Sequence, residues 1–154
     1  MTNGLKKAWT ELVQPLLRRP REHQVAALCW RDAEGGDGIE ILLITSRGTG
    51  RWVMPKGWPI EGLTGAEAAL REAWEEAGVT GAPPAATPIG SYDYGKTQES
   101  GYDLAVAVQV YKLHVQGLSD SFPESGERRR AWVSPAKAAT MVREPGLQDI
   151  LRAL

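Results

Sequence analysis

The sequence predicts a single α/β (α+β) domain with a mixed β-sheet, and three observations lead to this fold class. Short apolar runs typical of strands alternate along the chain with segments whose apolar residues recur at helical spacing. The length of 154 residues suits one domain with one substantial core, and the chain shows no internal repeat. With 42% hydrophobic and 24% charged residues, the composition is that of an ordinary soluble globular protein.

The first 22 residues carry apolar side chains at helical spacing, and Pro15 is expected to interrupt the helix. We predict a helical extension over residues 1–22 that packs on a domain of residues 23–154. The basic residues of this segment leave open a targeting or membrane-surface helix, which Glu11 and Glu22 disfavour. The segment lacks the apolar core of a signal peptide, and no apolar run is long enough to cross a bilayer. We therefore expect a cytoplasmic protein without a membrane partner.

The remaining strands and helices are predicted from alternation, turn residues and caps. The predicted strands cover residues 23–31, 38–46, 51–55, 87–94, 102–115 and 129–134, and the fourth and fifth form a hairpin with a long tip. Ser134 followed by Pro135 predicts a helix start, and a last helix covers roughly residues 145–154. Cys29 is the only cysteine and lies in an apolar strand, so a buried thiol is expected and an internal disulfide is excluded.

A helix with both ends marked is predicted between the third and fourth of these strands. Thr64 is followed three residues later by Glu67, which is the pattern of a capping box. Gly78 is suited to end the helix in the left-handed conformation. The helix is therefore expected over residues 65–77.

This helix concentrates acids on one face. At about 100° per residue, Glu72, Glu75 and Glu76 share an arc of roughly 100°. The apolar residues gather around the far side, with Trp74 among them, and this side is expected to face the core. Ala68 falls among the acids and is expected to leave room for a ligand to approach.

Two interpretations of the acidic face stay open. Like charges at these spacings repel by roughly a few tenths of a kcal/mol per pair, which a solvated surface tolerates. A hard divalent cation would turn the repulsion into attraction, because Mg²⁺ prefers carboxylate and carbonyl oxygens. The face therefore indicates either solvated acids or a Mg²⁺ site.

The segments around the helix favour the second interpretation. The loop PKGWPIEG contains Gly57 and Gly62, which permit a close approach of the main chain to a ligand. Cations surrounding a carboxylate-held metal suit a polyanionic phosphate substrate. The candidate phosphate-binding cations are Arg47, Arg51, Lys56, Arg128 and Arg130, and Glu124 and Glu127 lie close to the last two in the sequence.

Gly57 and the run REAWEEAGV at residues 71–79 resemble the signature of the Nudix hydrolases. That signature has a glutamate six positions after its first glycine, where this chain has Leu63. The segments SRGTGRWVMPKG and GERRRAWVSPAKA further resemble the diphosphoinositol polyphosphate phosphohydrolase branch. The resemblance implies a Nudix-type α/β/α sandwich with a catalytic loop–helix–loop.

The resemblance also implies roles for individual residues. Glu72, Glu76 and Glu75 would form the metal centre, with the Lys56 carbonyl and Gly57 close to the metal. The catalytic base would be Glu75 or Glu72, and both assignments stay open. Lys56 and the four arginines named above would bind the substrate, and Glu124 or Glu127 would add a further ligand or base.

The implied activity is hydrolysis of a phosphoanhydride with Mg²⁺, or Mn²⁺, as the cofactor. The implied substrates are diphosphoinositol polyphosphates or dinucleoside polyphosphates. Leu63 keeps open a catalytically weak Nudix-fold sensor of a phosphorylated ligand. An RNA 5′-end pyrophosphohydrolase is a third alternative, although the net charge of −1 makes a nucleic-acid partner unlikely. A homodimer is also left open.

Overall fold

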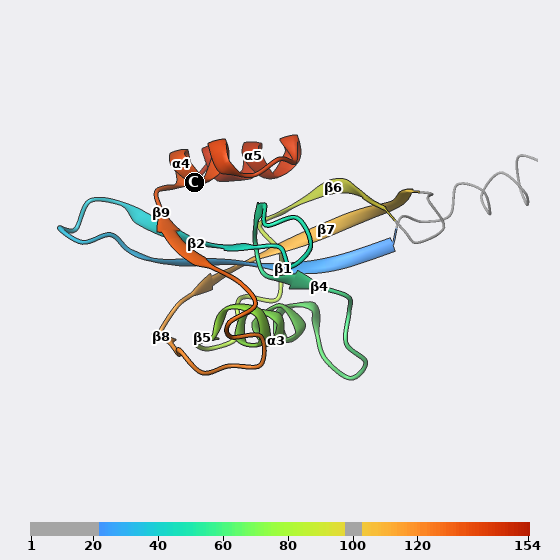
Figure 1. Cartoon of the computed structure of the whole chain (residues 1–154), viewed down its shortest axis with the longest axis horizontal. Helices are drawn as coiled ribbons and strands as arrows, with labels where there is room; N and C mark the ends of the chain where they lie inside the picture. Colours follow the sequence, from blue (N-terminus) through green and yellow to red (C-terminus); the bar gives the residue numbers. More distant parts are fainter. Residues whose placement is uncertain (1–21, 98–102) are drawn as a thin grey trace, which may run out of the picture.

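The computed structural model describes residues 22–97 and 103–154 (Figure 1). Residues 1–21 of the predicted N-terminal extension and residues 98–101 of the predicted hairpin tip lie outside these residues, whereas Glu22 and residues 95–97 belong to strands. The main sheet contains β1 (Glu22–Asp32), β2 (Ile39–Thr45), β3 (Trp52–Val53), β4 (Lys56–Gly57), β6 (Gly90–Thr97), β7 (Asp103–His114) and β9 (Arg130–Val133). The helices are α3 (Gly65–Ala77), α4 (Pro135–Met141) and α5 (Pro145–Arg152), and β5 (Val79–Thr80) pairs with β8 (Gly117–Leu118) in a second, small sheet.

The main sheet is mixed, as predicted. Its strand order is β3-β2-β1-β7-β6, with β4 paired to β1 and β9 paired to β2. The central strands β1 and β7 run parallel, with Ala26 opposite Val110, and the other pairs are antiparallel. The long parallel pair therefore forms the centre on which the rest of the fold is built.

Helices cover both faces of this sheet, which confirms the α/β/α arrangement. In Figure 1, α3 lies below the sheet and α4 and α5 lie above it. Alternation along β1 serves both layers, because Ala27 and Cys29 belong to the cluster that packs on α3. Ala26 and Leu28 belong to the cluster that packs under α4 and α5. Burial raises the pKa of the Cys29 thiol to about 12, as expected for an inert core cysteine.

The packing of α3 differs from the expected helix wheel at two positions. Ala68 is buried in the core cluster, so it opens no space among the acids. Trp74 is only half-buried and lines a groove on the outer side of the helix. The physical reason is size: small alanines let α3 lie close to the sheet, and the bulky indole is left to the side.

The strand β4 positions Lys56 and Gly57 beside α3. It pairs with β1 so that Gly57 lies opposite Val25 and Lys56 opposite Ala26. This pairing holds the loop after Pro55 directly beside α3, whose residues also contact β4. A two-residue strand of this kind depends on its partner, and the sequence pattern did not predict it.

Candidate functional site

The first turn of α3 is fixed by the predicted capping box. The Thr64 hydroxyl accepts a hydrogen bond from the Glu67 amide at 3.1 Å, and the Thr64 amide donates to Glu67 Oε1 at 2.9 Å. These bonds lower the pKa of Glu67. Gly78 ends the helix with φ of 72°, in the left-handed region that glycine favours. The helix is confirmed at residues 65–77. Because both of its ends are fixed, the position of its acidic residues relative to β4 is fixed as well.

Two of the predicted metal ligands lie against β4. Glu76 Oε2 accepts a hydrogen bond from the Lys56 amide at 3.1 Å. The Glu72 carboxylate lies so close to Gly57 that a Cβ there would sit 2.6 and 2.7 Å from its two oxygens. Only glycine therefore fits at position 57 without displacing Glu72, which explains the glycine by close approach and not by a positive φ.

These two carboxyls are held in an environment that disfavours their charge. Burial, followed by the negative charges of Glu76, Glu75 and Glu124, raises the pKa of Glu72 to about 7. Burial likewise raises the pKa of Glu76 to about 7, although Arg128 and the Lys56 amide act in the opposite direction. The protein thus keeps four acids close together at an electrostatic cost.

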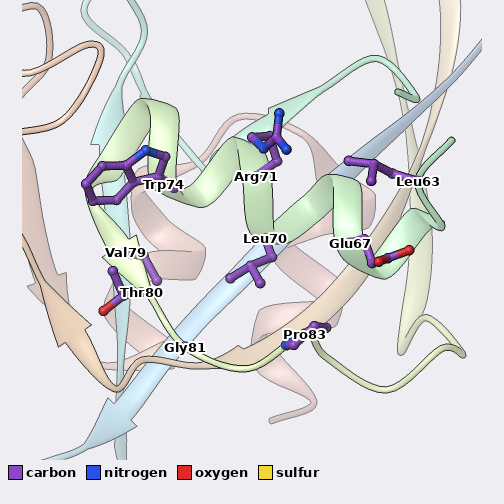
Figure 2. Close-up of a pocket in the computed structure, with 9 residues that line it drawn as sticks. All are labelled: Leu63, Glu67, Leu70, Arg71, Trp74, Val79, Thr80, Gly81 and Pro83. Carbon is purple, nitrogen blue, oxygen red and sulfur yellow. The ribbon is translucent and has the colours of Figure 1, made fainter. Parts of the chain in front are cut away.

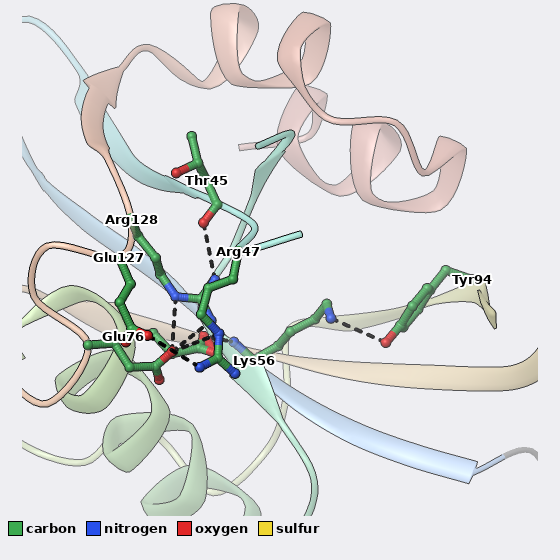
Figure 3. A network of polar contacts seen from close by, with 8 residues as sticks. Thr45, Arg47, Lys56, Glu76, Tyr94, Glu127 and Arg128 are labelled. Atoms are coloured by element: carbon green, nitrogen blue, oxygen red, sulfur yellow. Dashed lines mark hydrogen bonds and ion pairs between the residues drawn. The ribbon is translucent and has the colours of Figure 1, made fainter. Parts of the chain in front are cut away.

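A nearly buried arginine lies between two of these acids (Figure 3). The Arg128 side chain is 8% exposed, and its Nη2 lies 3.3 Å from Glu76 Oε1 and 3.0 Å from Glu124 Oε1. Its Nη1 donates to the Thr45 carbonyl at 3.1 Å. Arg128 therefore joins α3, the loop before β9 and the end of β2.

The network continues to Arg47 at the surface. Arg47 lies 3.3 Å from Glu124 and 3.8 Å from Glu127, and its side chain is 59% exposed. The loop that carries both acids is tied to α3, because the Glu124 amide donates to the Glu75 carbonyl at 3.0 Å. The structure thus brings Arg47, Arg128, Glu124 and Glu127 together with the acidic helix face.

Lys56 extends from this cluster towards β6. Its Nζ lies 3.2 Å from the Tyr94 hydroxyl, which donates to Gln24 Oε1 at 2.7 Å. Burial lowers the pKa of Lys56, and the charge of Glu76 opposes this shift. Figure 3 shows the lysine side chain running along the sheet to Tyr94, away from the carboxylates that its own amide contacts.

Two of the predicted substrate arginines have other partners. Arg130 donates to the carbonyls of Ala77 at 2.9 Å and Ser119 at 2.7 Å, at the C-terminal end of α3. Arg51 pairs with the buried Glu144 at 2.7 Å, at the start of α5. Arg51 still acts on the pKa of Lys56 through its charge, whereas Arg130 supports the helix end.

Sequence reasoning missed four residues of the polar network: Gln24, Thr45, Tyr94 in its contact with Lys56, and Glu144. Three of them lie in predicted strands, and Glu144 directly precedes a predicted helix. Their only available signal was a polar residue in an otherwise apolar element, which does not identify its partner.

The carboxylates fit a hard divalent cation by their chemistry. Clustered carboxylate and carbonyl oxygens are the ligand set that Mg²⁺ favours, and a cation would stabilise the charged carboxylates that burial and the neighbouring acids disfavour. In residues 22–97 and 103–154 no group of three acidic, histidine or cysteine side chains forms a ready-made metal cage. Glu76 is instead occupied by Arg128 and by the Lys56 amide, so a cation requires these carboxylates to reorient.

The opposite side of α3 carries an apolar groove with a volume of about 360 Å³. Figure 2 shows Leu70 and Trp74 projecting from the helix towards residues 79–81. Leu63 also lines this groove and packs against the core cluster of α3. The residue that departs from the Nudix signature is thus accommodated by apolar contacts.

Comparison with known proteins identifies the relatives of this chain. A family model described as the NUDIX domain matches residues 22–154. The Arabidopsis thaliana protein "Nudix hydrolase 21, chloroplastic" is 34% identical over 121 residues, which are 77% of this chain and 58% of the relative. This chain thus spans less than two thirds of that relative's length.

Solved structures agree on the fold. A C. elegans Ap4A hydrolase superposes with a TM-score of 0.60 at 21% identity, covering 86% of this chain and 95% of the other. A MutT protein from Methanosarcina mazei Go1 superposes with a TM-score of 0.60 at 25% identity, covering 87% and 92%. Within the described part of the chain, no helix is both long and apolar enough to cross a membrane.

Proposed function

The chain belongs to the NUDIX domain family, and from this we propose that it hydrolyses a phosphoanhydride bond in a small phosphorylated substrate. The observation that carries the proposal is the juxtaposition of β4 and α3. Glu76 accepts the Lys56 amide, Glu72 lies against Gly57, and the pKa of each carboxyl is raised to about 7. A solvated acidic face would show no such confinement.

Mg²⁺ is the proposed cofactor, with Mn²⁺ as a substitute. Glu72 and Glu76 would hold it, with the Lys56 carbonyl, Gly57 and Glu75 beside it, and Glu124 or Glu127 would add a ligand. When bound, the cation supplies positive charge that stabilises the charge developing on phosphate oxygens. The residues of the chain perform the other tasks.

Glu75 is the proposed base. It would accept a proton from the attacking water as the water oxygen bonds to phosphorus and the bridging P–O bond breaks, leaving the second phosphate as the leaving group. Glu72 is the alternative base. Arg47 and Arg128 would bind the phosphate oxygens, since their guanidinium groups contact the acidic cluster. The Lys56 ammonium would join them by turning from the Tyr94 hydroxyl towards the substrate.

Charge compensation favours dinucleoside polyphosphates over diphosphoinositol polyphosphates as substrates. In the described residues each of the four predicted substrate arginines already lies near a carboxylate, at 3.3 Å for Arg47, 2.7 Å for Arg51, 3.0 Å for Arg128 and 2.9 Å for Arg130. A fully phosphorylated inositol ring carries charge on every side and needs more uncompensated cations than this. A linear phosphate chain needs fewer.

The proposal is tested with purified protein, Mg²⁺ and the two substrate classes in parallel, by measuring the released phosphates and nucleotides. Glu75→Gln should stay folded and lose roughly 10²-fold or more of the turnover, because the proton acceptor is gone. Undiminished turnover in this variant would assign the base role to another residue, with Glu72→Gln as the next variant.

Two alternative functions have distinct outcomes when 5′-triphosphorylated RNA and a melting-temperature measurement are added to this assay. If no substrate turns over and a phosphorylated ligand still raises the melting temperature, the protein is a sensor. If only 5′-triphosphorylated RNA is hydrolysed, it is an RNA 5′-end pyrophosphohydrolase. Both remain alternatives to the small-molecule hydrolase.

The expected cytoplasmic location, the homodimer and the packed extension at residues 1–22 stay predictions. The 34% identical plant relative is named as chloroplastic, which says nothing of the location of this chain. Fluorescent tagging of the full chain and sedimentation of the purified protein address the first two.

A further inference from the structure

Arg128 is a nearly buried positive charge shared by two acids of the site. Its Nη2 contacts Glu76 Oε1 and Glu124 Oε1 at 3.3 and 3.0 Å, and only 8% of the side chain is exposed. The Glu76 and Glu124 side chains are 11% and 19% exposed. A pair of confined carboxylates without this guanidinium would face each other's charge at low dielectric, which is costly.

The main chain beside Arg128 and one edge of its guanidinium are held by Thr45, whereas Nη2 contacts both Glu76 and Glu124. The Arg129 amide donates to Thr45 Oγ1 at 2.9 Å, so the main chain beside Arg128 is tied to the end of β2. The Arg128 Nη1 bond to the Thr45 carbonyl holds one edge of the guanidinium. The other edge, formed by Nη2 and by Nε at 3.3 Å from Glu124 Oε1, contacts only carboxylates, which another anion could replace without moving the main chain.

We propose that Arg128 is the counter-ion of Glu76 and Glu124 while no ligand is bound. When the divalent cation binds these carboxylates, Arg128 releases them, and its guanidinium then binds a substrate phosphate. This inference rests on the proposed function and adds to it that binding of the divalent cation and binding of the substrate depend on each other. A guanidinium and a divalent cation repel each other at this range, so Arg128 weakens cation binding while the substrate is absent. A phosphate that engages the guanidinium removes this penalty, and cation and substrate therefore favour each other's binding.

The linkage gives Arg128 a signature that a merely structural residue lacks. Replacing it should strengthen one ligand and weaken the other. A structural defect would weaken both ligands or neither. The measurement is therefore binding of Mg²⁺ alone and of a non-hydrolysable phosphoanhydride analogue, each by titration calorimetry on the full chain.

Arg128→Gln is expected to bind Mg²⁺ about tenfold more tightly than the wild type in the absence of substrate. The same variant should bind the analogue about tenfold more weakly at saturating Mg²⁺, since a bidentate phosphate contact is lost. Arg128→Met, which keeps the apolar stem, should show both changes and serves where the glutamine variant does not fold. Arg128→Lys keeps the charge, so its Mg²⁺ affinity should stay within about twofold of the wild type.

Arg129→Gln is the matched control. It removes the same charge from the neighbouring position, and the Arg129 guanidinium lies over the Trp52 ring, 5.5 Å from its centroid. Its Mg²⁺ affinity should therefore stay within about twofold of the wild type.

Unchanged or weaker Mg²⁺ binding in a folded Arg128→Gln or Arg128→Met protein would overturn the inference and leave the proposed function intact. An equal increase of Mg²⁺ affinity in Arg128→Lys or Arg129→Gln would also overturn it, because the change in affinity would then not depend on the charge at position 128. Failure of the wild type to take up Mg²⁺ even with the analogue would instead overturn the proposed function, and this inference with it.

Discussion

At the scale of single residues, Gly57 sets the position of the Glu72 carboxylate. We expect Gly57→Ala to push this carboxylate away, because the added Cβ would lie 2.6 and 2.7 Å from its oxygens. The Glu72 side chain is long and flexible, so it can yield at little cost in stability. Mg²⁺ affinity and turnover should therefore fall about tenfold or more, while the urea midpoint changes little.

Gly48→Ala is the matched control for this prediction. A Cβ at position 48 meets no heavy atom within 4 Å, and Gly48 lies in the turn between β2 and β3. It should keep wild-type Mg²⁺ affinity. Equal losses of Mg²⁺ affinity in both variants would contradict the role given to Gly57, because the loss would not depend on contact with Glu72.

The residues of the site were predictable to the extent that they are close in sequence. Glu72, Glu75 and Glu76 share one helical turn, and the spacing alone placed them on one face. The partners that fix them are not local: Glu76 contacts the amide of Lys56, 20 positions away, and Arg128 contacts Thr45, 83 positions away. Only the folded sheet brings these groups together.

At the scale of elements, the start of α3 depends on Thr64. Thr64→Ala removes the hydroxyl that accepts the Glu67 amide, and the destabilisation should be about 1 kcal/mol, as for other N-cap losses. Thr64→Ser keeps the acceptor and should recover most of this loss. Urea unfolding followed by circular dichroism measures both. An alanine variant with the wild-type midpoint would show that the cap contributes nothing here.

The same helix shows which features of an element follow from the sequence. Its bounds came out as predicted because caps are local: Thr64 and Gly78 act on their own neighbours. The burial of Ala68 and the half-exposed Trp74 were not predicted, because a helix wheel gives directions but not the distance to the sheet. The tertiary contact decides which side chains are small enough to be covered.

At the scale of the whole molecule, two layers meet the sheet at the site. α3 supplies the acids from one face, and the pair between Arg51 and Glu144 ties the segment before β3 to α5 on the other. Glu144 is 7% exposed, and its Oε2 has no hydrogen-bond partner among the described residues. Lys56 therefore lies between the buried carboxylates of Glu76 and Glu144, which both act on its pKa. Burying these charges costs free energy of folding.

This cost makes stability depend on pH and on the cation. The pKa values of Glu72 and Glu76 are raised from 4.5 to about 7 in the folded protein, so the folded state binds protons that the unfolded state has released. Their contribution to stability is therefore present below pH 4.5 and is lost as the pH rises to about 7. Above that pH both carboxylates are charged and a divalent cation finds them free of protons.

We therefore expect saturating Mg²⁺ to raise the melting temperature more at pH 8 than at pH 5.5, by at least roughly 3 °C, the shift that about 1 kcal/mol gives in a domain of this size. In the variant Glu72→Gln/Glu76→Gln neither side chain titrates, so the gain should be small and equal at both pH values. Differential scanning calorimetry on the two proteins measures it. A gain in the wild type that does not change with pH would mean that the cation does not compete with protons for these carboxylates, and hence that it binds elsewhere.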